Sequence, residues 1–166
     1  MLGVDHRLLV AMRTFGHNSP SVERAVGRLS RSGEHGACWF ALGAVGMALS
    51  RTQQRREAWR RGLEVAAVAY GLNYALKLAV RRDRPRLDGL PPLSGVVSAL
   101  SFPSAHATIS FAAAGAYARA LPPATGLLYG GAAMLALSRP YLGVHYPSDV
   151  VAGALLGGLV AGAWPR

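Results

Sequence analysis

Three short polar segments interrupt the long apolar runs of this chain and carry the side chains best suited to chemistry. Their sequences are KLAVRRDRP (77–85), SFPSAH (101–106) and SRPYLGVHYPSD (138–149). Ionisable residues are costly next to lipid, so those found at the ends of apolar runs indicate function. If the fold brings the three segments together, they supply two histidines, a carboxylate and several cations to one site.

The third segment contains a histidine and an acid four residues apart, His145 and Asp149. A carboxylate beside an imidazole fixes the tautomer of the ring and raises its basicity, which leaves the other ring nitrogen free to attack or to move a proton. His106, in the second segment, is then a candidate for the acid that protonates a leaving oxygen. A lone histidine is more often a satisfied polar residue, so this prediction depends on the segments converging.

The first segment contains the only lysine of a chain with 18 lysines and arginines, Lys77. If the preceding helix continues to Arg84, then Lys77, Arg81 and Arg84 share one helix face, which would bind an anion. An ammonium is a compact point charge, whereas a guanidinium is a planar fork, so the two types suit different positions around a phosphate. We expect Arg82 and Arg86 to extend to lipid headgroups instead.

Proline followed by serine opens the apolar runs that start near residues 104 and 148, in FPSAH and YPSD. This pattern predicts helix starts, with Ser104 and Ser148 as caps. The free N–H groups of a helix start attract anions, so Ser104 to His106 is a candidate phosphate site. For Ser148 we expect capping alone.

Together these residues supply an anion cradle, a nucleophile with its orienting acid, and a second histidine for the leaving oxygen. That set is suited to phosphoryl transfer through a phosphohistidine. A metal site fits less well, because the only other acid in the three segments is Asp83, among arginines, and the histidines lack the spacing of a zinc-binding pair.

The composition indicates a helical membrane protein, since 51% of residues are hydrophobic and only 16% are charged. Long runs are free of charge and rich in small residues, which lets membrane helices pack closely. We therefore predict an all-α, polytopic membrane protein with about five spans. The predicted spans are 36–50, 62–80, 104–120, 126–141 and 148–164.

The segments outside these spans predict an orientation. Residues 4–32 contain two weakly amphipathic stretches that we expect to lie as interfacial helices on the membrane, and 1–35 is taken as an N-terminal part preceding a catalytic domain at 36–166. No cleavable signal peptide is expected. The basic stretch 51–61 predicts a cytoplasmic loop, which puts 81–101 and the three polar segments on the extracytoplasmic face of the plasma membrane.

The three segments resemble the signature of the type 2 phosphatidic acid phosphatase (PAP2) family. KLAVRRDRP fits Lys-x6-Arg-Pro, PSAH fits Pro-Ser-Gly/Ala-His, and SRPYLGVHYPSD fits Ser-Arg-x5-His-x3-Asp. The resemblance implies a PAP2-like helical bundle that needs no metal or cofactor. It implies His145 as nucleophile, Asp149 as its partner and His106 as general acid. It also implies phosphate binding by Lys77, Arg84, Ser104, Ala105 and Arg139, with Ala105 standing where glycine is commoner.

The stretches GEHG-CW near residue 34, LSFPSAHAT and ALSR…LGVHYPSDV look most like small bacterial phosphatases of polyprenyl-linked precursors. This resemblance implies a polyprenyl-phosphoryl sugar phosphate as substrate. Undecaprenyl diphosphate, phosphatidate and phosphatidylglycerophosphate remain alternatives within the family, and a vanadate-dependent haloperoxidase is a more distant one. From another class, a non-catalytic lipid-binding or transport protein remains open. We expect membrane lipids as neighbours and no nucleic acid as partner. Whether copies of the chain associate is left open.

Overall fold

The computed structural model describes residues 3–15 and 19–165. Within them it contains only helices, turns and one isolated β-bridge. The α-helices are α1 (Val4–Thr14), α2 (Pro20–Ser32), α3 (Ala37–Ala48), α4 (Gln53–Val80), α5 (Ala105–Ala120), α6 (Thr125–Tyr141) and α7 (Pro147–Ala163). Two short 3-10 helices, η1 (Glu34–Gly36) and η2 (Pro122–Ala124), precede α3 and α6. The predicted all-α class is confirmed.

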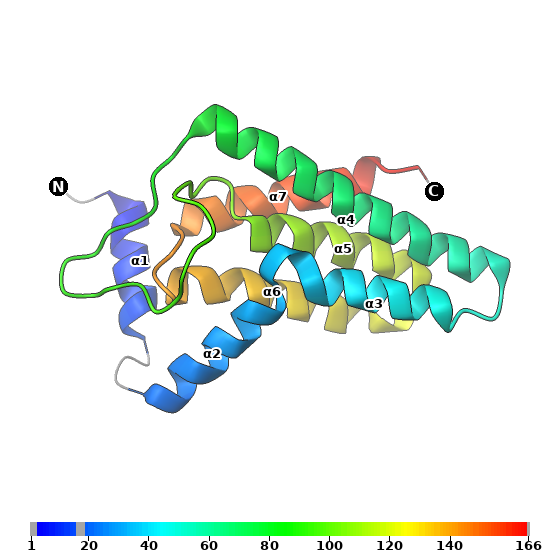
Figure 1. The fold of residues 1–166 in the computed structure, drawn as a ribbon, viewed down its shortest axis with the longest axis horizontal. Helices are drawn as coiled ribbons and strands as arrows, with labels where there is room; N and C mark the ends of the chain where they lie inside the picture. The colour runs from blue at the N-terminus through cyan, green and yellow to red at the C-terminus, as the bar shows by residue number, and fades with distance from the viewer. Residues whose placement is uncertain (1–2, 16–18, 166) are drawn as a thin grey trace.

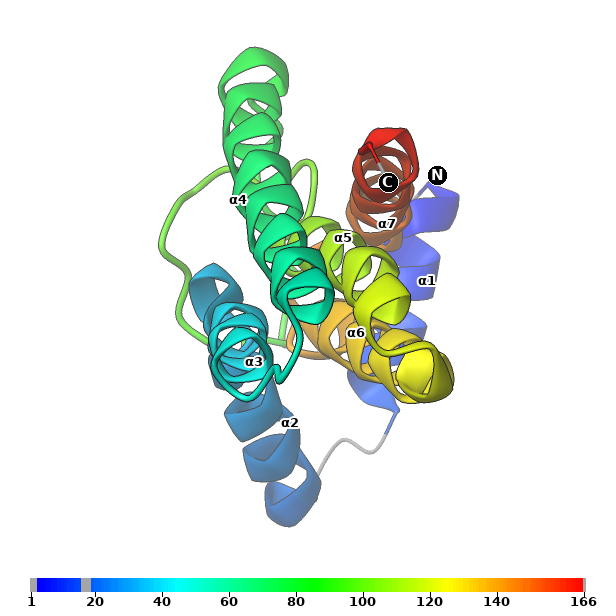
Figure 2. The same cartoon turned by 90° about the vertical axis from the view of Figure 1, so that its right-hand side faces the viewer.

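Helices α3 to α7 form a bundle along the long axis of the molecule, with α5 in the middle (Figures 1 and 2). Helix α5 packs against α4, α6 and α7, and it is buried because it presents small side chains on every side. Those of Ala107, Ala112 and Ala113 have no exposed surface. Small residues let the backbones approach closely, which is the packing that the sequence predicts.

The contact between α5 and α7 depends on glycine. A Cβ atom on Gly157 would lie 2.2 Å from the carbonyl oxygen of Thr108, and one on Gly153 would lie 2.6 Å from that of Ser104. Backbone atoms cannot move aside as a flexible side chain can, so these two glycines set the distance between the helices. That distance in turn fixes how the first turn of α7 stands beside the first turn of α5.

Apolar side chains are exposed on the outside of the bundle. Helix α4 is long and apolar enough to cross a membrane, and α7 is a shorter apolar helix; both statements concern the described residues alone. Helices occupy all five predicted spans, but those other than α4 are shorter than the roughly 20 residues that a bilayer core requires. The exposed apolar residues include Leu72, Leu76, Val80, Leu127, Leu137, Leu155 and Leu159.

Helix α4 differs from the prediction at both ends. It begins at Gln53, so most of the basic stretch 51–61 is helical and is not a loop. It ends at Val80, where Arg81 adopts a left-handed conformation with φ of 53°. The prediction that Lys77, Arg81 and Arg84 share a helix face is therefore wrong, because the chain turns before Arg84.

The segment 81–104 closes back on itself at the end of α4. Asp83 and Leu100 form the isolated β-bridge, and Ser101 N donates to Arg82 O at 2.7 Å. Helix α1 lies across the same end of the bundle and packs against α6 and α7 (Figure 1). These two elements enclose the loop ends of α4, α5, α6 and α7, where the three polar segments lie.

Candidate active site

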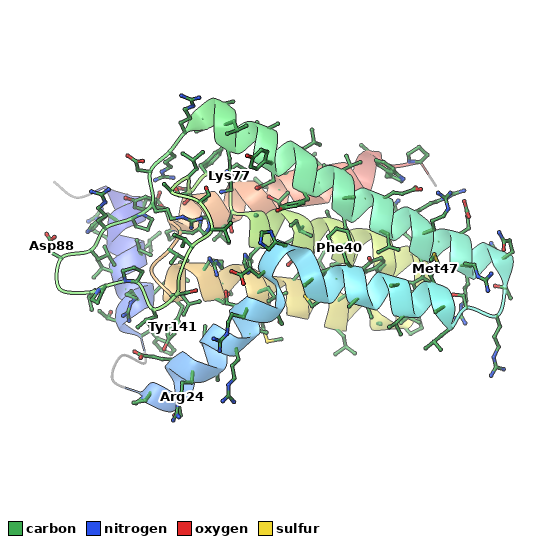
Figure 3. All side chains as sticks on the ribbon, in the orientation of Figure 1. Arg24, Phe40, Met47, Lys77, Asp88 and Tyr141 are labelled. Atoms are coloured by element: carbon green, nitrogen blue, oxygen red, sulfur yellow. The ribbon has the colours of Figure 1, made fainter. Side chains whose placement is uncertain are left out.

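A cavity of about 120 Å³ lies at this end of the bundle. Lys77 reaches it from the end of α4 that faces the 81–104 segment (Figure 3). Side chains from all three polar segments line the cavity. Of the residues predicted from the sequence, the lining includes Lys77, Arg84, Ala105, His106, Arg139 and His145. The other two, Ser104 and Asp149, are fully buried behind this lining.

His145 stands between the Asp149 carboxylate and the cavity. Its Nδ1 lies 3.4 Å from Asp149 Oδ2, longer than a well-formed hydrogen bond, and Nδ1 has no other partner among the described residues. Its Nε2 lies 3.0 Å from Arg84 Nη1. Because arginine can only donate, His145 Nε2 accepts this hydrogen bond. The proton of the neutral ring is therefore on Nδ1, facing the carboxylate. The unprotonated nitrogen, which accepts from Arg84, is thus the one toward the cavity.

Burial keeps the His145 ring neutral. Burial is the largest cause of its shift and lowers the pKa of His145 to about 3, with Arg84 acting in the same direction and Asp149 opposing it. Burial also lowers the pKa of Arg84, although Asp149 opposes this, and the guanidinium stays charged at neutral pH. A neutral imidazole beside a cation is the protonation state needed for attack on an anionic ester.

Asp149 is held by donors on three sides. Its Oδ2 accepts from Ser101 Oγ and from Tyr146 N, each at 2.9 Å, and its Oδ1 accepts from Arg82 Nη1 at 2.8 Å. These bonds fix the carboxylate in place and keep it ionised. Its orientation toward His145 is therefore set by groups from all three polar segments.

Arg82 belongs to this network and does not extend to lipid headgroups, so that prediction is wrong. Besides Asp149, it donates to Ser148 Oγ at 2.7 Å and to Asp5 Oδ2 at 2.8 Å. Asp5, in α1, also accepts from Ser148 N at 3.0 Å and from its hydroxyl. Burial raises the pKa of Asp5, but the hydrogen bonds from Ser148 and Arg82 outweigh it and lower that pKa overall.

The predicted helix starts are half correct. Ser104 is the N-cap residue of α5, as predicted, but its buried hydroxyl has no hydrogen-bond partner in the part of the chain that the structure describes. Helix α7 starts at Pro147 with Tyr146 at the N-cap, so Ser148 does not cap it and instead joins the network of Asp5 and Arg82. Ser148 is the second residue of α7, because Pro147 occupies the first helical position, which proline favours.

Helix α2 contributes a residue that the sequence did not predict, Ser30. Its carbonyl oxygen accepts from His106 Nε2 at 2.9 Å, and its hydroxyl accepts from Arg139 Nη1. Since a carbonyl only accepts, the His106 proton is on Nε2 and Nδ1 carries the lone pair. Ser30 is 1% exposed. One residue thus holds both His106 and Arg139.

Lys77 forms no ion pair with an acid among the described residues. Its Nζ donates to the carbonyl oxygens of Leu100 at 3.1 Å and Ser101 at 3.3 Å. Only 7% of Lys77 is exposed. A cation held by two carbonyls at the cavity wall retains a third donor for an anion. Within the described residues, no group of three or more histidines, cysteines and acids could hold a metal ion.

The sequence did not predict that Ser30, Asp5, Ser101 and Arg82 would take part in the hydrogen-bond network of the candidate site. Ser101 stands inside a polar segment, so its position was a usable signal. Asp5 and Ser30 lie in the N-terminal part, where no motif or spacing marks them. Only the packing of α1 and α2 against the site brings them there.

The fold and the cavity together define a class of protein. A helical bundle with an apolar exterior and a cation-lined cavity at one end is suited to an enzyme that acts on anions at a membrane. Residues 58–166 match the PAP2 superfamily. The chain belongs to this superfamily and is a membrane-bound phosphatase.

Relatives and solved structures agree with this assignment. The chain is 42% identical over 150 residues to decaprenylphosphoryl-5-phosphoribose phosphatase of Mycolicibacterium smegmatis, covering 90% of this chain and 81% of that protein. It superposes on a transmembrane PAP2-type phosphatidylglycerolphosphate phosphatase of Bacillus subtilis with a TM-score of 0.70 and 24% identity, covering 95% of this chain and 81% of that one. For Aquifex aeolicus LpxE the TM-score is 0.74 at 20% identity, covering 96% and 93%. The two structures establish the fold alone.

Proposed function

We propose that this protein hydrolyses the phosphomonoester of a polyprenyl-phosphoryl sugar phosphate, namely decaprenylphosphoryl-5-phosphoribose, through a phosphohistidine. One observation carries the mechanism. His145 presents an unprotonated Nε2 toward a cavity with three cationic side chains, while its protonated Nδ1 faces the buried Asp149. The substrate follows from the relative that shares 42% identity over most of both chains.

In the first step, the substrate phosphate takes the donors of Arg84 and thereby frees His145 Nε2. The Nε2 lone pair attacks phosphorus, and the bond from phosphorus to the ester oxygen breaks. That oxygen takes a proton from the imidazolium form of His106, which forms when Nδ1, unprotonated in the structure, takes up a proton beside the bound anionic phosphate. The Nε2 proton of His106 stays in its hydrogen bond to the Ser30 carbonyl, so the proton that the ester oxygen receives comes from Nδ1. Lys77, Arg84 and Arg139 offset the charge of the phosphoryl oxygens.

In the second step, water attacks the phosphohistidine. His106, now neutral, accepts a proton from that water, and the bond between phosphorus and His145 Nε2 breaks. Inorganic phosphate leaves, and both histidines return to their starting protonation states. Asp149 stabilises the charge that the His145 ring gains, because its carboxylate lies 3.4 Å from Nδ1, and Ser101, Tyr146 and Arg82 keep the carboxylate in position.

For the setting of the reaction, we propose a multi-pass protein of the plasma membrane with the cavity on the extracytoplasmic side. The exposed apolar faces of α4, α6 and α7 support lipid contact. Five arginines between residues 51 and 61 lie at the opposite end of α4 from the cavity and favour the cytoplasmic side. Residues 1–35 would then lie on the outer surface, with α1 and α2 covering the site.

Phosphate release from a panel of lipid phosphates in detergent tests the proposal. The panel contains decaprenylphosphoryl-5-phosphoribose, undecaprenyl diphosphate, phosphatidate and phosphatidylglycerophosphate. We expect the highest kcat/KM for the first, no loss of activity with EDTA, and loss of nearly all turnover in His145→Ala. Acid-labile label from a 32P-substrate should appear on wild-type protein and not on that variant. Preference for another lipid would reject the substrate, and a fully active His145→Ala would reject the mechanism.

A further inference from the structure

The turn between α2 and α3 brings two polar side chains to the cavity that the proposed mechanism does not use. Glu34 and His35 both line it, beside the cationic groups that would hold the phosphate. Neither lies within the three polar segments, and both precede the part of the chain that matches the superfamily. The position of Glu34 and His35 in the cavity wall therefore indicates a role other than the proposed phosphoryl transfer.

The backbone fixes this turn tightly. His35 has φ of 52° and Gly36 has φ of 73°, so two successive residues adopt the left-handed conformation that side chains disfavour. A Cβ atom on Gly36 would lie 2.8 Å from Ile109 Cγ2. The His35 ring is held by a hydrogen bond of 2.9 Å between its Nδ1 and Tyr70 Oη. The turn is thus anchored on α4 and α5, and it keeps Glu34 at the cavity.

The charge of Glu34 is opposite to that of its surroundings. Among the described residues that line the cavity it is the only carboxylate, whereas Lys77, Arg84 and Arg139 are cations. A carboxylate only accepts hydrogen bonds, so it binds a hydroxyl group and repels a phosphate oxygen. A carboxylate beside a phosphate site favours substrate binding where the group attached to the phosphate carries hydroxyls.

Glu34 also lines a second, larger cavity of about 550 Å³. That cavity lies between α2 and residues 93–95, and its walls carry Arg31 and Ser94. Because Glu34 borders both spaces, a substrate with its phosphate in the small cavity can extend past this carboxylate into the larger one. In this arrangement Glu34 lies next to the first groups of the substrate beyond the reacting phosphate.

We propose that Glu34 is a specificity-determining residue that selects a hydroxyl-bearing leaving group. Its carboxylate accepts a hydrogen bond from a hydroxyl close to the ester oxygen and repels a second phosphate attached directly to the first. The site therefore favours a sugar phosphate over a lipid diphosphate. This inference rests on the proposed function for the sugar, whereas the preference against diphosphates rests on the charge of Glu34 at the border of the two cavities.

The substitution Glu34→Gln tests the proposal, since it removes the charge and keeps the shape. The kcat/KM should fall about tenfold for decaprenylphosphoryl-5-phosphoribose, as a hydrogen bond to a charged acceptor is lost. It should rise about fivefold for undecaprenyl diphosphate, as one repulsion between like charges disappears. The matched control is Asp88→Asn, an exposed acid on the 81–104 segment that lines neither cavity (Figure 3). It should leave both values unchanged.

A fall in kcat/KM for the sugar phosphate together with a rise for the diphosphate distinguishes a change of specificity from a general loss of activity. Equal falls for both substrates, or an unchanged ratio, would overturn the proposal. If the wild-type protein does not hydrolyse the decaprenyl substrate, the proposed function fails, and the inference is judged on a second pair. That pair is phosphatidylglycerophosphate, whose leaving glycerol carries a hydroxyl, and diacylglycerol diphosphate. Glu34→Gln should shift their ratio in the same direction, and an unchanged ratio there rejects the inference as well.

Discussion

The role of Ser30 gives a prediction in a part of the chain that precedes the superfamily match. In Ser30→Ala the carbonyl that binds His106 remains, whereas the hydroxyl that accepts from Arg139 Nη1 is lost. Arg139 is 6% exposed, and its Nε already has no partner. The substitution therefore leaves a buried guanidinium with fewer acceptors and a less defined position.

The expected size follows from that one bond. A hydrogen bond to a charged group contributes about 1.5–3 kcal/mol. At about 1.4 kcal/mol for each factor of ten, kcat/KM should fall roughly 10- to 100-fold. Since Arg139 is proposed to bind the phosphoryl oxygens, the inhibition constant of inorganic phosphate should rise in parallel.

Initial rates of phosphate release at several substrate concentrations, with and without added phosphate, measure both effects. The matched control is Ser32→Ala, whose hydroxyl is exposed and donates only to Leu29 O of its own helix at 2.7 Å. It should behave as wild type. Ser30→Thr keeps a hydroxyl and should recover most of the lost kcat/KM.

Three results would refute this reasoning. One is a Ser30→Ala enzyme with wild-type kcat/KM. Another is a loss that Ser32→Ala shares, which would indicate a general effect of α2. The last is a fall in kcat/KM with no change in the inhibition constant of phosphate, because the lost contact would then not concern phosphate binding. Thermal unfolding in detergent shows whether each variant remains folded.

Three further predictions concern the support of the site. Asp5→Asn should lower kcat about three- to tenfold, because Arg82 loses one of its carboxylates and holds Asp149 less firmly; rates at saturating substrate measure it, and an unchanged kcat would contradict the network. Gly157→Ala should destabilise the protein by about 1–3 kcal/mol, because its Cβ would meet Thr108 O, whereas Gly158→Ala, with nothing within 4 Å, should not; melting temperatures compare the two, and equal values would disprove the close approach. Burial lowers the pKa of His145 to about 3 in the folded protein, whereas an unfolded histidine takes up a proton below about pH 6.5. The contribution of His145 to the free energy of unfolding is therefore complete above about pH 6.5. As the pH falls toward 3, this contribution decreases by up to about 1.4 kcal/mol per pH unit. His145→Gln should flatten that slope in melting curves, and an unchanged slope would exclude His145 as its source.

The helices were predictable because their signal is local. Uncharged runs, proline at a helix start and small residues all act within one or two turns, and they located α3, α5, α6 and α7 to within a few residues. The exceptions were the two ends of α4. The charge of the arginines from Arg51 to Arg61 predicts a loop, but most of them lie in α4, because arginine favours helices. The stop at Val80 has no proline or glycine beside it to announce it.

The candidate site was predictable as a set of residues but not as a geometry. Lys77, His106, Arg139 and His145 occur in recognisable spacings, and the structure brings them to one cavity. Nothing in those spacings says which nitrogen of a histidine is free. That depends on Arg84 Nη1 at one ring and on Ser30 O at the other, and both come from distant segments.

Composition and short spacings are enough to predict the helical class, the apolar exterior and the residue types suited to phosphoryl transfer. The hydrogen-bond partners of those residues depend on how the helices pack. Asp5 and Ser30 act from helices with no motif, Arg82 turns inward to Asp149, and Glu34 meets the cavity through two left-handed residues. The physical reason is range: helix formation is governed by neighbours along the chain, whereas hydrogen bonds and charge pairs depend on atoms a few ångströms apart in space.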